Sequence, residues 1–211
     1  MVKKRNNCEK DSIVALSFPV RRSFNFAHVL TSVRLVLTPV FLVVIETGYR
    51  QSTLLNALTV VVLFLLICAS DYYDGPVARA LGVDSDFGKV LDNLADITFL
   101  LVTLTFLVHI GTTPWWIPTA IALAFGQYTV DSWLLAGRKT DVVLVSNPIG
   151  HWAGILNYIG TGVVALHTAS QQLLPQLLLQ SFLVGWLLYL LLAMAMRLRF
   201  FLRIRGARSC T

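Results

Sequence analysis

Four aspartates in the first half of the chain have the residue type and spacing of a metal site. Asp71 and Asp74 are three residues apart, and Asp92 and Asp96 are four apart. On helices, both spacings place the two side chains on one face, about one turn apart. Two such helices facing each other would offer an oxygen-rich site to hard divalent cations. We therefore predict Mg²⁺ or Mn²⁺ as the cofactor, with two ions per site as the natural load for four acids.

The apolar surroundings of these aspartates make metal compensation necessary. The chain is 56% hydrophobic and only 13% charged, with a mean hydropathy of +0.70, whereas a soluble domain carries about 25% charged residues. An ionised carboxylate within a bilayer costs on the order of 2.5 kcal/mol or more. Arg79 and Lys89 are the only basic residues between Asp71 and Asp96. Ion pairing alone would therefore leave a charge deficit that metal ions can fill.

Apolar blocks of roughly 20 residues, the length of a membrane-spanning helix, must position these side chains. There are six of them: 27–46, 54–70, 92–110, 116–135, 150–168 and 177–196. We predict an all-α integral membrane protein with six transmembrane helices, and five spans with one re-entrant segment is the alternative. The predicted parts are a cytosolic N-terminal arm (1–22), a six-helix membrane domain (23–197) and a basic cytosolic tail (198–211).

Basic residues gather on one side of this layout. They precede the first block, separate the second from the third and the fourth from the fifth, and follow the sixth. By the positive-inside rule, both termini and the aspartates face the cytoplasm. Topology and anionic headgroups explain the net charge of +6 without a nucleic-acid partner. We predict a multi-pass protein of a bacterial cytoplasmic membrane, with its active site at the cytosolic membrane edge.

Small residues and an arginine beside the acids suit a phosphorylated ligand. Gly75, Ala78 and Gly88 lie one step or one turn from the aspartates and leave room for a ligand close to the backbone. Arg79 follows the first pair of acids, and its planar guanidinium is a suitable fork for phosphate oxygens. These positions favour a site that handles a phosphorylated group beside the metals.

The stretch Asp71–Asp96 resembles the signature of the CDP-alcohol phosphotransferase (CDP-alcohol phosphatidyltransferase class I) family, D-x2-D-G-x2-A-R-x8-G-x3-D-x3-D, at every fixed position. The resemblance implies an enzyme of phospholipid biosynthesis, usually a homodimer, that transfers a phosphatidyl group from CDP-diacylglycerol to a small alcohol and releases CMP. It also implies that the four aspartates hold two divalent ions, with Asp71 and Asp92 bridging and Asp96 as the general base. The implied contacts to the CDP donor are Gly75, Arg79 and Ser85, with clearance from Ala78 and Gly88.

The resemblance extends to the cytosolic end of the first span. His28, Thr31 and Arg34 are spaced to share one helix face there. Many family members carry an Asn-x-x-Thr-x-x-Arg pattern that contributes to the nucleotide site. Thr31 and Arg34 match this pattern, and His28 takes the place of the asparagine. We predict that all three contact the CDP donor.

The acceptor side matches the family less well. Members that use glycerol 3-phosphate usually carry Arg-Glu in span four and Gly-Lys-x-Lys-Thr at the start of span five. This chain has Gln127-Tyr128 and a stretch over 150–154 without lysine, which favours an uncharged or zwitterionic alcohol. The predicted acceptor residues are Asp131, which has no basic residue within one turn, together with Arg138, Lys139 and His151.

Two other functions are compatible with the intramembrane acids. A related transferase would use a soluble CDP-choline or CDP-ethanolamine donor and diacylglycerol as the acceptor, although the small size and six spans favour CDP-diacylglycerol. An ion-coupled transporter should carry polar residues through the middle of several spans. Here the main acids cluster at one membrane edge, and the polar residues noted toward the middle of the spans are Asp131 and Asn157.

Overall fold

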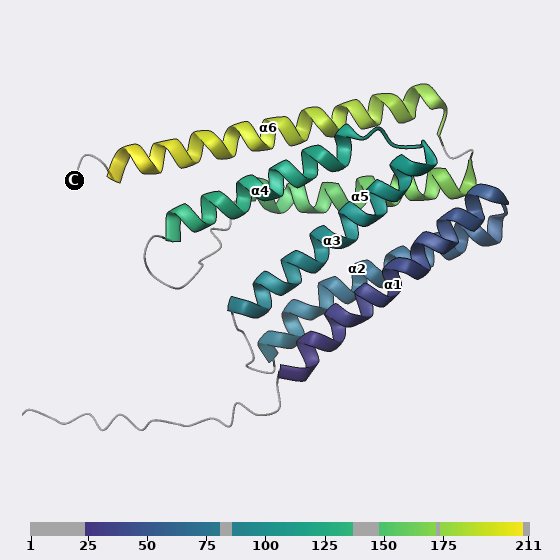
Figure 1. Cartoon of the computed structure of the whole chain (residues 1–211), viewed down its shortest axis with the longest axis horizontal. Helices are drawn as coiled ribbons and strands as arrows, with labels where there is room; N and C mark the ends of the chain where they lie inside the picture. Colours follow the sequence, from purple (N-terminus) through teal and green to yellow (C-terminus); the bar gives the residue numbers. More distant parts are fainter. Residues whose placement is uncertain (1–23, 81–85, 137–147, 172–173, 209–211) are drawn as a thin grey trace, which may run out of the picture.

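The computed structural model describes residues 24–80, 86–136, 148–171 and 174–208, with side chains over 33–73, 92–131, 152–171 and 174–201. Within these ranges the chain forms six helices and no strands (Figure 1). Each predicted apolar block falls inside one helix, so the all-α, six-helix architecture is confirmed. The helices are α1 (Phe24–Arg50), α2 (Leu54–Ala80), α3 (Asp86–Ile110), α4 (Trp116–Ala136), α5 (Pro148–Ser170) and α6 (Gln176–Arg208).

Three of the described helices contain a segment long and apolar enough to cross a bilayer. These segments are Leu54–Tyr73 in α2, Asp92–Ile110 in α3 and Gln176–Phe201 in α6. Leucines such as Leu65 and Leu188 are 58% and 61% exposed, where a water-soluble protein would bury most of a helix's apolar residues. The exposed apolar surface and the long apolar segments indicate an integral membrane protein.

Helices α3 and α5 lie between two outer pairs. On one side α1 packs against α2, both contact α5, and α1 also contacts α3. On the other side α4 packs against α6, while α4 contacts α3 and α6 contacts α5. Figure 1 shows α1 and α2 along one edge of the bundle and α6 along the opposite edge. Side chains on α3 and α5 can therefore reach both pairs.

Local sequence explains where the helices begin and end. Thr53 caps α2, because its Oγ1 accepts a hydrogen bond from the Asn56 N–H at 3.2 Å. Helix α3 ends where Gly111 adopts a φ of 90°, a conformation that glycine reaches without steric strain. The Thr112 N–H then donates to the Leu107 carbonyl at 3.1 Å. The chain can therefore reverse into α4 through the short connection 111–115.

Two glycines fix α5 between its neighbours. A methyl group at Gly160 would lie 2.6 Å from the Trp186 ring of α6, and one at Gly162 would lie 2.6 Å from the Phe64 ring of α2. Only glycine admits both rings this close to the α5 backbone. The Trp186 Nε1–H also donates to the Asn157 Oδ1 at 3.0 Å, which satisfies both buried polar groups. These contacts position the stretch of α5 that carries Asn157.

Helices α2 and α6 both continue beyond the C-terminal end of the predicted apolar block. Helix α2 continues past residue 70 to Ala80, so Asp71 is presented by a helix. Helix α6 continues past residue 196 to Arg208, which keeps Arg197 on the helix. The predicted division into arm, domain and tail stays a prediction.

Candidate active site

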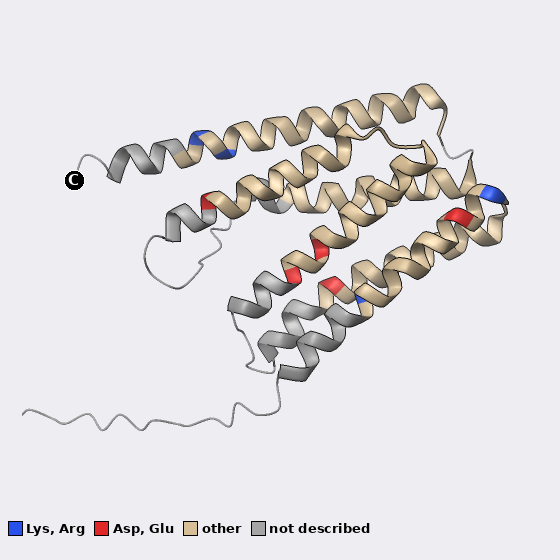
Figure 2. Cartoon of the chain, viewed as in Figure 1, with Lys and Arg blue, Asp and Glu red and all other residues tan. Residues whose placement is uncertain are grey.

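Three aspartates from two helices converge at one end of the bundle. Asp71 lies on α2, and Asp92 and Asp96 lie one turn apart on α3. One carboxylate oxygen from each residue lies within 4.8 Å of the others. Figure 2 shows the acidic positions of α2 and α3 facing each other. The structure thus brings together three of the four aspartates that were predicted to form one site.

Arg34 of α1 is fully buried among these carboxylates. Its Nη2–H donates to Asp71 Oδ1 at 2.7 Å, and its Nη1–H donates to Asp96 Oδ1. The same Nη1 lies 3.5 Å from Asp92 Oδ1. One guanidinium therefore faces three carboxylates, which leaves two formal negative charges within this described cluster.

This cluster fits a hard divalent cation. Asp92 Oδ1 is buried, and the described cation beside it, Arg34 at 3.5 Å, is shared with two other carboxylates. A bound metal ion would offset the negative charge that remains. Mg²⁺ and Mn²⁺ bind through a few carboxylates and share their other positions with water and phosphate oxygens. Asp71 and Asp96 border an open cavity, so such additional ligands have access.

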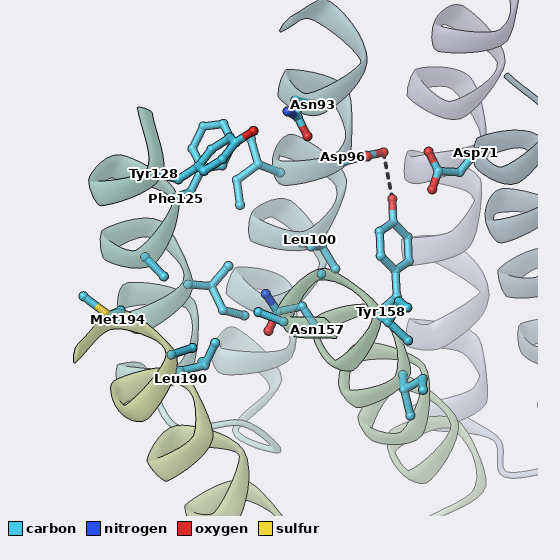
Figure 3. A pocket seen from close by; sticks show the side chains of 18 of the residues that line it. Asp71, Asn93, Asp96, Leu100, Phe125, Tyr128, Asn157, Tyr158, Leu190 and Met194 are labelled. Carbon is cyan, nitrogen blue, oxygen red and sulfur yellow. Dashed lines mark hydrogen bonds between the residues drawn. The ribbon is translucent and has the colours of Figure 1, made fainter. Parts of the chain in front are cut away.

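Tyr158 of α5 contacts the same cluster from another side. Its hydroxyl donates to Asp96 Oδ1 at 2.9 Å, as Figure 3 shows. Its ring stacks on Phe99 of α3, with the ring centroids 5.9 Å apart and the planes inclined by 22°. Phe99 is itself buried and packs against Phe41 of α1. Asp96 is therefore held by donors from both α1 and α5.

A cavity of about 920 Å³ extends from the carboxylates between α3, α4, α5 and α6. Asp71, Asp96 and Tyr158 line one part of it, and Tyr128 and Arg197 line another. Figure 3 shows Tyr128 across the cavity from Asp71 and Tyr158. The wall between these two ends is mainly apolar, with Ile97, Leu100, Ile121, Phe125, Leu190 and Met194. The site thus has an acidic end and a second polar end.

The second end is built around Arg197 of α6. Its guanidinium carbon lies 4.1 Å from the centroid of the Tyr128 ring, within cation–π range. Its Nε lies 3.6 Å from Asp131 Oδ2 of α4. Asp131 is buried and is not among the cavity-lining residues. The predicted acceptor residue Asp131 thus contacts Arg197 and does not line the cavity, whereas Arg197 does.

The structure gives Asp131 a basic partner that lies far from it in the sequence. No basic residue lies within one turn of it in the sequence, yet Arg197 reaches it from another helix. Asn157, which the sequence left as a polar residue of span five, lines the cavity and is tied to Trp186. Both residues acquire their partners through contacts between helices.

The side chains of the remaining predicted site residues lie outside the described part of the structure, and their roles stay predictions. Helix positions whose side chains are not described are His28, Thr31, Asp74, Gly75, Ala78, Arg79, Gly88 and His151. Positions outside the described residues altogether are Ser85, Arg138 and Lys139.

Tyr158 and Arg197 are cavity residues that the sequence predictions did not assign to the site. A tyrosine within a membrane span needs a partner for its hydroxyl, which is a signal for Tyr158 but names no partner. Arg197 follows the last apolar block, where a basic residue is also explained by topology. Only the packing of α5 on α3 and of α6 on α4 assigns these two residues to the cavity.

Curated relatives with similar sequences are named for phosphatidyl transfer. A probable phosphatidylglycerophosphate synthase of Mycobacterium tuberculosis is 34% identical over 100 residues, which are 47% of each chain. The CDP-diacylglycerol–glycerol-3-phosphate 3-phosphatidyltransferase of Bacillus subtilis is 29% identical over 145 residues, 63% of this chain and 74% of the relative. The enzyme of that name from Cereibacter sphaeroides is 26% identical over 153 residues, 72% and 67% of the two chains.

The family model matches a longer part of this chain than the Mycobacterium tuberculosis relative does. The chain spans about half the length of the Mycobacterium tuberculosis protein that it matches. The model of the family described as CDP-alcohol phosphatidyltransferase matches residues 24–203, from the start of α1 almost to the end of α6. With three of the four signature aspartates converging on one site, the chain belongs to the CDP-alcohol phosphatidyltransferase family.

Proposed function

We propose that this protein transfers a phosphatidyl group from CDP-diacylglycerol to a hydroxyl of a small alcohol and releases CMP. The observation that carries the proposal is the convergence of Asp71, Asp92 and Asp96 beside an open cavity in a chain of this family. The names of the relatives specify CDP-diacylglycerol and glycerol 3-phosphate as their substrates. They support CDP-diacylglycerol as the donor to test first.

Asp71, Asp92 and Asp96 would hold the divalent cations, together with the predicted ligand Asp74. When bound, two such ions would neutralise the diphosphate of the donor and the charge that develops on the leaving CMP. Arg34 is fully buried against the same carboxylates. We therefore propose that Arg34 keeps these carboxylates in place, and that its effect on binding of the CDP donor comes from their position.

Asp96 is the proposed general base. It takes the proton of the acceptor hydroxyl as that oxygen attacks the phosphorus of the phosphatidyl group. A new phosphorus–oxygen bond to the acceptor forms, the bond from phosphorus to the CMP oxygen breaks, and CMP leaves with the electron pair. Asp96 lines the cavity, which gives an acceptor access. A carboxylate near a metal is a weak base, so its precise position contributes as much as its proton affinity.

The acceptor is proposed to bind in the cavity between Asp96 and Arg197. Arg197 is a cation that lines this space, and a guanidinium suits an acceptor phosphate. Arg197 would supply a positive charge in place of the basic residues that spans four and five of this chain lack. Glycerol 3-phosphate is therefore the first acceptor to test. Asp131 offsets part of the Arg197 charge, so an uncharged polyol is the second.

Several further features are proposed from the family resemblance. The donor contacts are His28, Thr31, Gly75, Ala78, Arg79, Ser85 and Gly88, and further acceptor contacts are Arg138, Lys139 and His151. The protein would be a homodimer with six spans in a bacterial cytoplasmic membrane. Its active site would face the cytosol, beside anionic lipids. The inward excess of basic residues supports this orientation.

Removal of divalent metal should abolish turnover. After dialysis against EDTA, we expect CMP release from CDP-diacylglycerol to fall at least about a hundredfold, because the carboxylates alone repel the donor diphosphate. Addition of Mn²⁺ or Mg²⁺ should restore it, and addition of the same concentration of Na⁺ should not. Full turnover in EDTA would contradict the metal assignment.

Loss of Arg197 should weaken the acceptor and spare the donor. In Arg197→Gln we expect the KM for glycerol 3-phosphate to rise about tenfold, the loss of one charge-assisted hydrogen bond, with the KM for CDP-diacylglycerol unchanged. Arg199→Gln is the matched control, because it removes the same charge from an exposed position on α6. An equal KM in the Arg197 variant and the wild type would remove Arg197 from the acceptor site.

The decisive experiment compares donors and acceptors directly. Purified protein with Mn²⁺ is given CDP-diacylglycerol or CDP-choline as donor, each with a panel of alcohols or diacylglycerol, and the lipid products are identified by mass spectrometry. We expect CMP and a new phospholipid from CDP-diacylglycerol alone. Product formed from CDP-choline and diacylglycerol would instead support the related transferase.

A further inference from the structure

We propose that Tyr158 is a positioning residue that orients the carboxylate of Asp96 for proton transfer. The inference rests on the proposed function, in which Asp96 is the base. The Tyr158 hydroxyl donates to Asp96 Oδ1 at 2.9 Å, and the Arg34 Nη1–H donates to that same oxygen. Two donors on Oδ1 hold the plane of the carboxyl group. Both hydrogen bonds described for Asp96 go to Oδ1, so we assign the proton of the acceptor to Oδ2.

Tyr158 differs from Arg34 in what it contacts. Arg34 lies against all three carboxylates, so its charge stabilises the whole cluster. The hydrogen bond from Tyr158 goes to Asp96, the one aspartate with a proposed role in proton transfer. Tyr158 and Asp96 also both line the cavity, so their hydrogen bond lies where the acceptor hydroxyl must arrive. This placement fits a role in orienting the base.

The surroundings of Tyr158 are rigid enough for that role. Its ring stacks on buried Phe99, which packs in turn on Phe41. The preceding residue, Asn157, is tied to Trp186 by a hydrogen bond of 3.0 Å. A side chain held by packing on one side and by its helix on the other can keep a partner within a fraction of an ångström. Small displacements of a catalytic group have large effects on rate.

A buried tyrosine hydroxyl needs some partner in any protein, so the test must separate positioning from packing. Tyr158→Phe removes only the hydroxyl and keeps the ring on Phe99. We expect kcat to fall about tenfold, because the carboxylate of Asp96 loses one of its two described donors. The KM for CDP-diacylglycerol and the Mn²⁺ concentration for half-maximal rate should stay within about twofold of wild type.

Two controls accompany this variant. Tyr189→Phe removes a hydroxyl from α6 at a position outside the cavity lining and should leave kcat unchanged. Phe99→Leu removes the stacking partner of Tyr158 and keeps the hydroxyl, so it should lower kcat by less than Tyr158→Phe. A thermal melt of each purified variant reports whether the fold is intact.

The outcomes separate the inference from the proposed function. If the wild type releases CMP from CDP-diacylglycerol and Tyr158→Phe has an unchanged kcat, the positioning role is wrong and the proposed function stands. The same holds if Tyr158→Phe only lowers the melting temperature or raises the KM for CDP-diacylglycerol. A wild type that does not release CMP from this donor overturns both. A selective fall in kcat supports the positioning role.

Discussion

Asp96→Asn should reduce CMP release from CDP-diacylglycerol by at least about a thousandfold, near the upper part of the range for a lost general base. Asparagine keeps the size of the side chain and can still accept the hydrogen bond from Tyr158. It cannot take the proton of the acceptor, and it removes one negative charge from the proposed metal ligands. The rate is measured as CMP formed by purified protein at saturating Mn²⁺.

Glu46→Gln is the matched control for this substitution. It makes the same change of charge on α1, where Glu46 pairs with the exposed Arg50 at 2.6 Å, away from the cavity lining. We expect the activity of this variant to equal that of the wild type. Turnover of Asp96→Asn within tenfold of wild type would remove Asp96 from the role of base.

Arg34→Gln should lower the stability of the fold, because it removes a buried cation from among three carboxylates. Removing one partner of a buried ion pair costs about 3–5 kcal/mol, and the partly exposed aspartates reduce this to roughly 2 kcal/mol here. For a chain of this size that corresponds to a fall in Tm of about 4–8 °C in EDTA. The cause is repulsion between carboxylates that Arg34 holds together in the wild type.

Metal should compensate for the missing guanidinium, which makes the prediction specific. Added Mn²⁺ should raise the Tm of Arg34→Gln by more than it raises that of the wild type, because the ion meets no competing cation in the variant. Arg50→Gln, which breaks an exposed pair with Glu46, should change the Tm by about 1–2 °C at most. Equal melting temperatures of Arg34→Gln and wild type in EDTA would show that Arg34 does not hold the carboxylates.

The helices and the acidic cluster are predictable because both depend on local spacing. An apolar block of bilayer length predicts a helix from composition alone, and the structure has one helix for each block. Asp92 and Asp96 lie four residues apart, so any helix places them on one face. Asp71 of α2 lies close to both of them in the structure.

Arg34 illustrates a partial prediction. Its spacing from Thr31 predicted a functional face of the first helix, and the resemblance assigned that face to the nucleotide, which stays a prediction. In the structure, three carboxylates surround Arg34. Helical spacing identifies which side chains share a face, and the helix that packs against this face depends on the tertiary arrangement.

By itself, the sequence determined the all-α membrane architecture, the family and the one-turn spacing of Asp92 and Asp96, because apolar length and i,i+4 spacing act within single helices. Only the tertiary structure decided that Tyr158 contacts Asp96 and that Arg197 lies between Tyr128 and Asp131. These contacts join α5 to α3 and α6 to α4. Close approaches of Phe64 and Trp186 to two glycines of α5 set the packing of α5 against α2 and α6 in the same way. The rotation of one helix against another depends on such side-chain fits across the whole bundle, and a local pattern does not encode it.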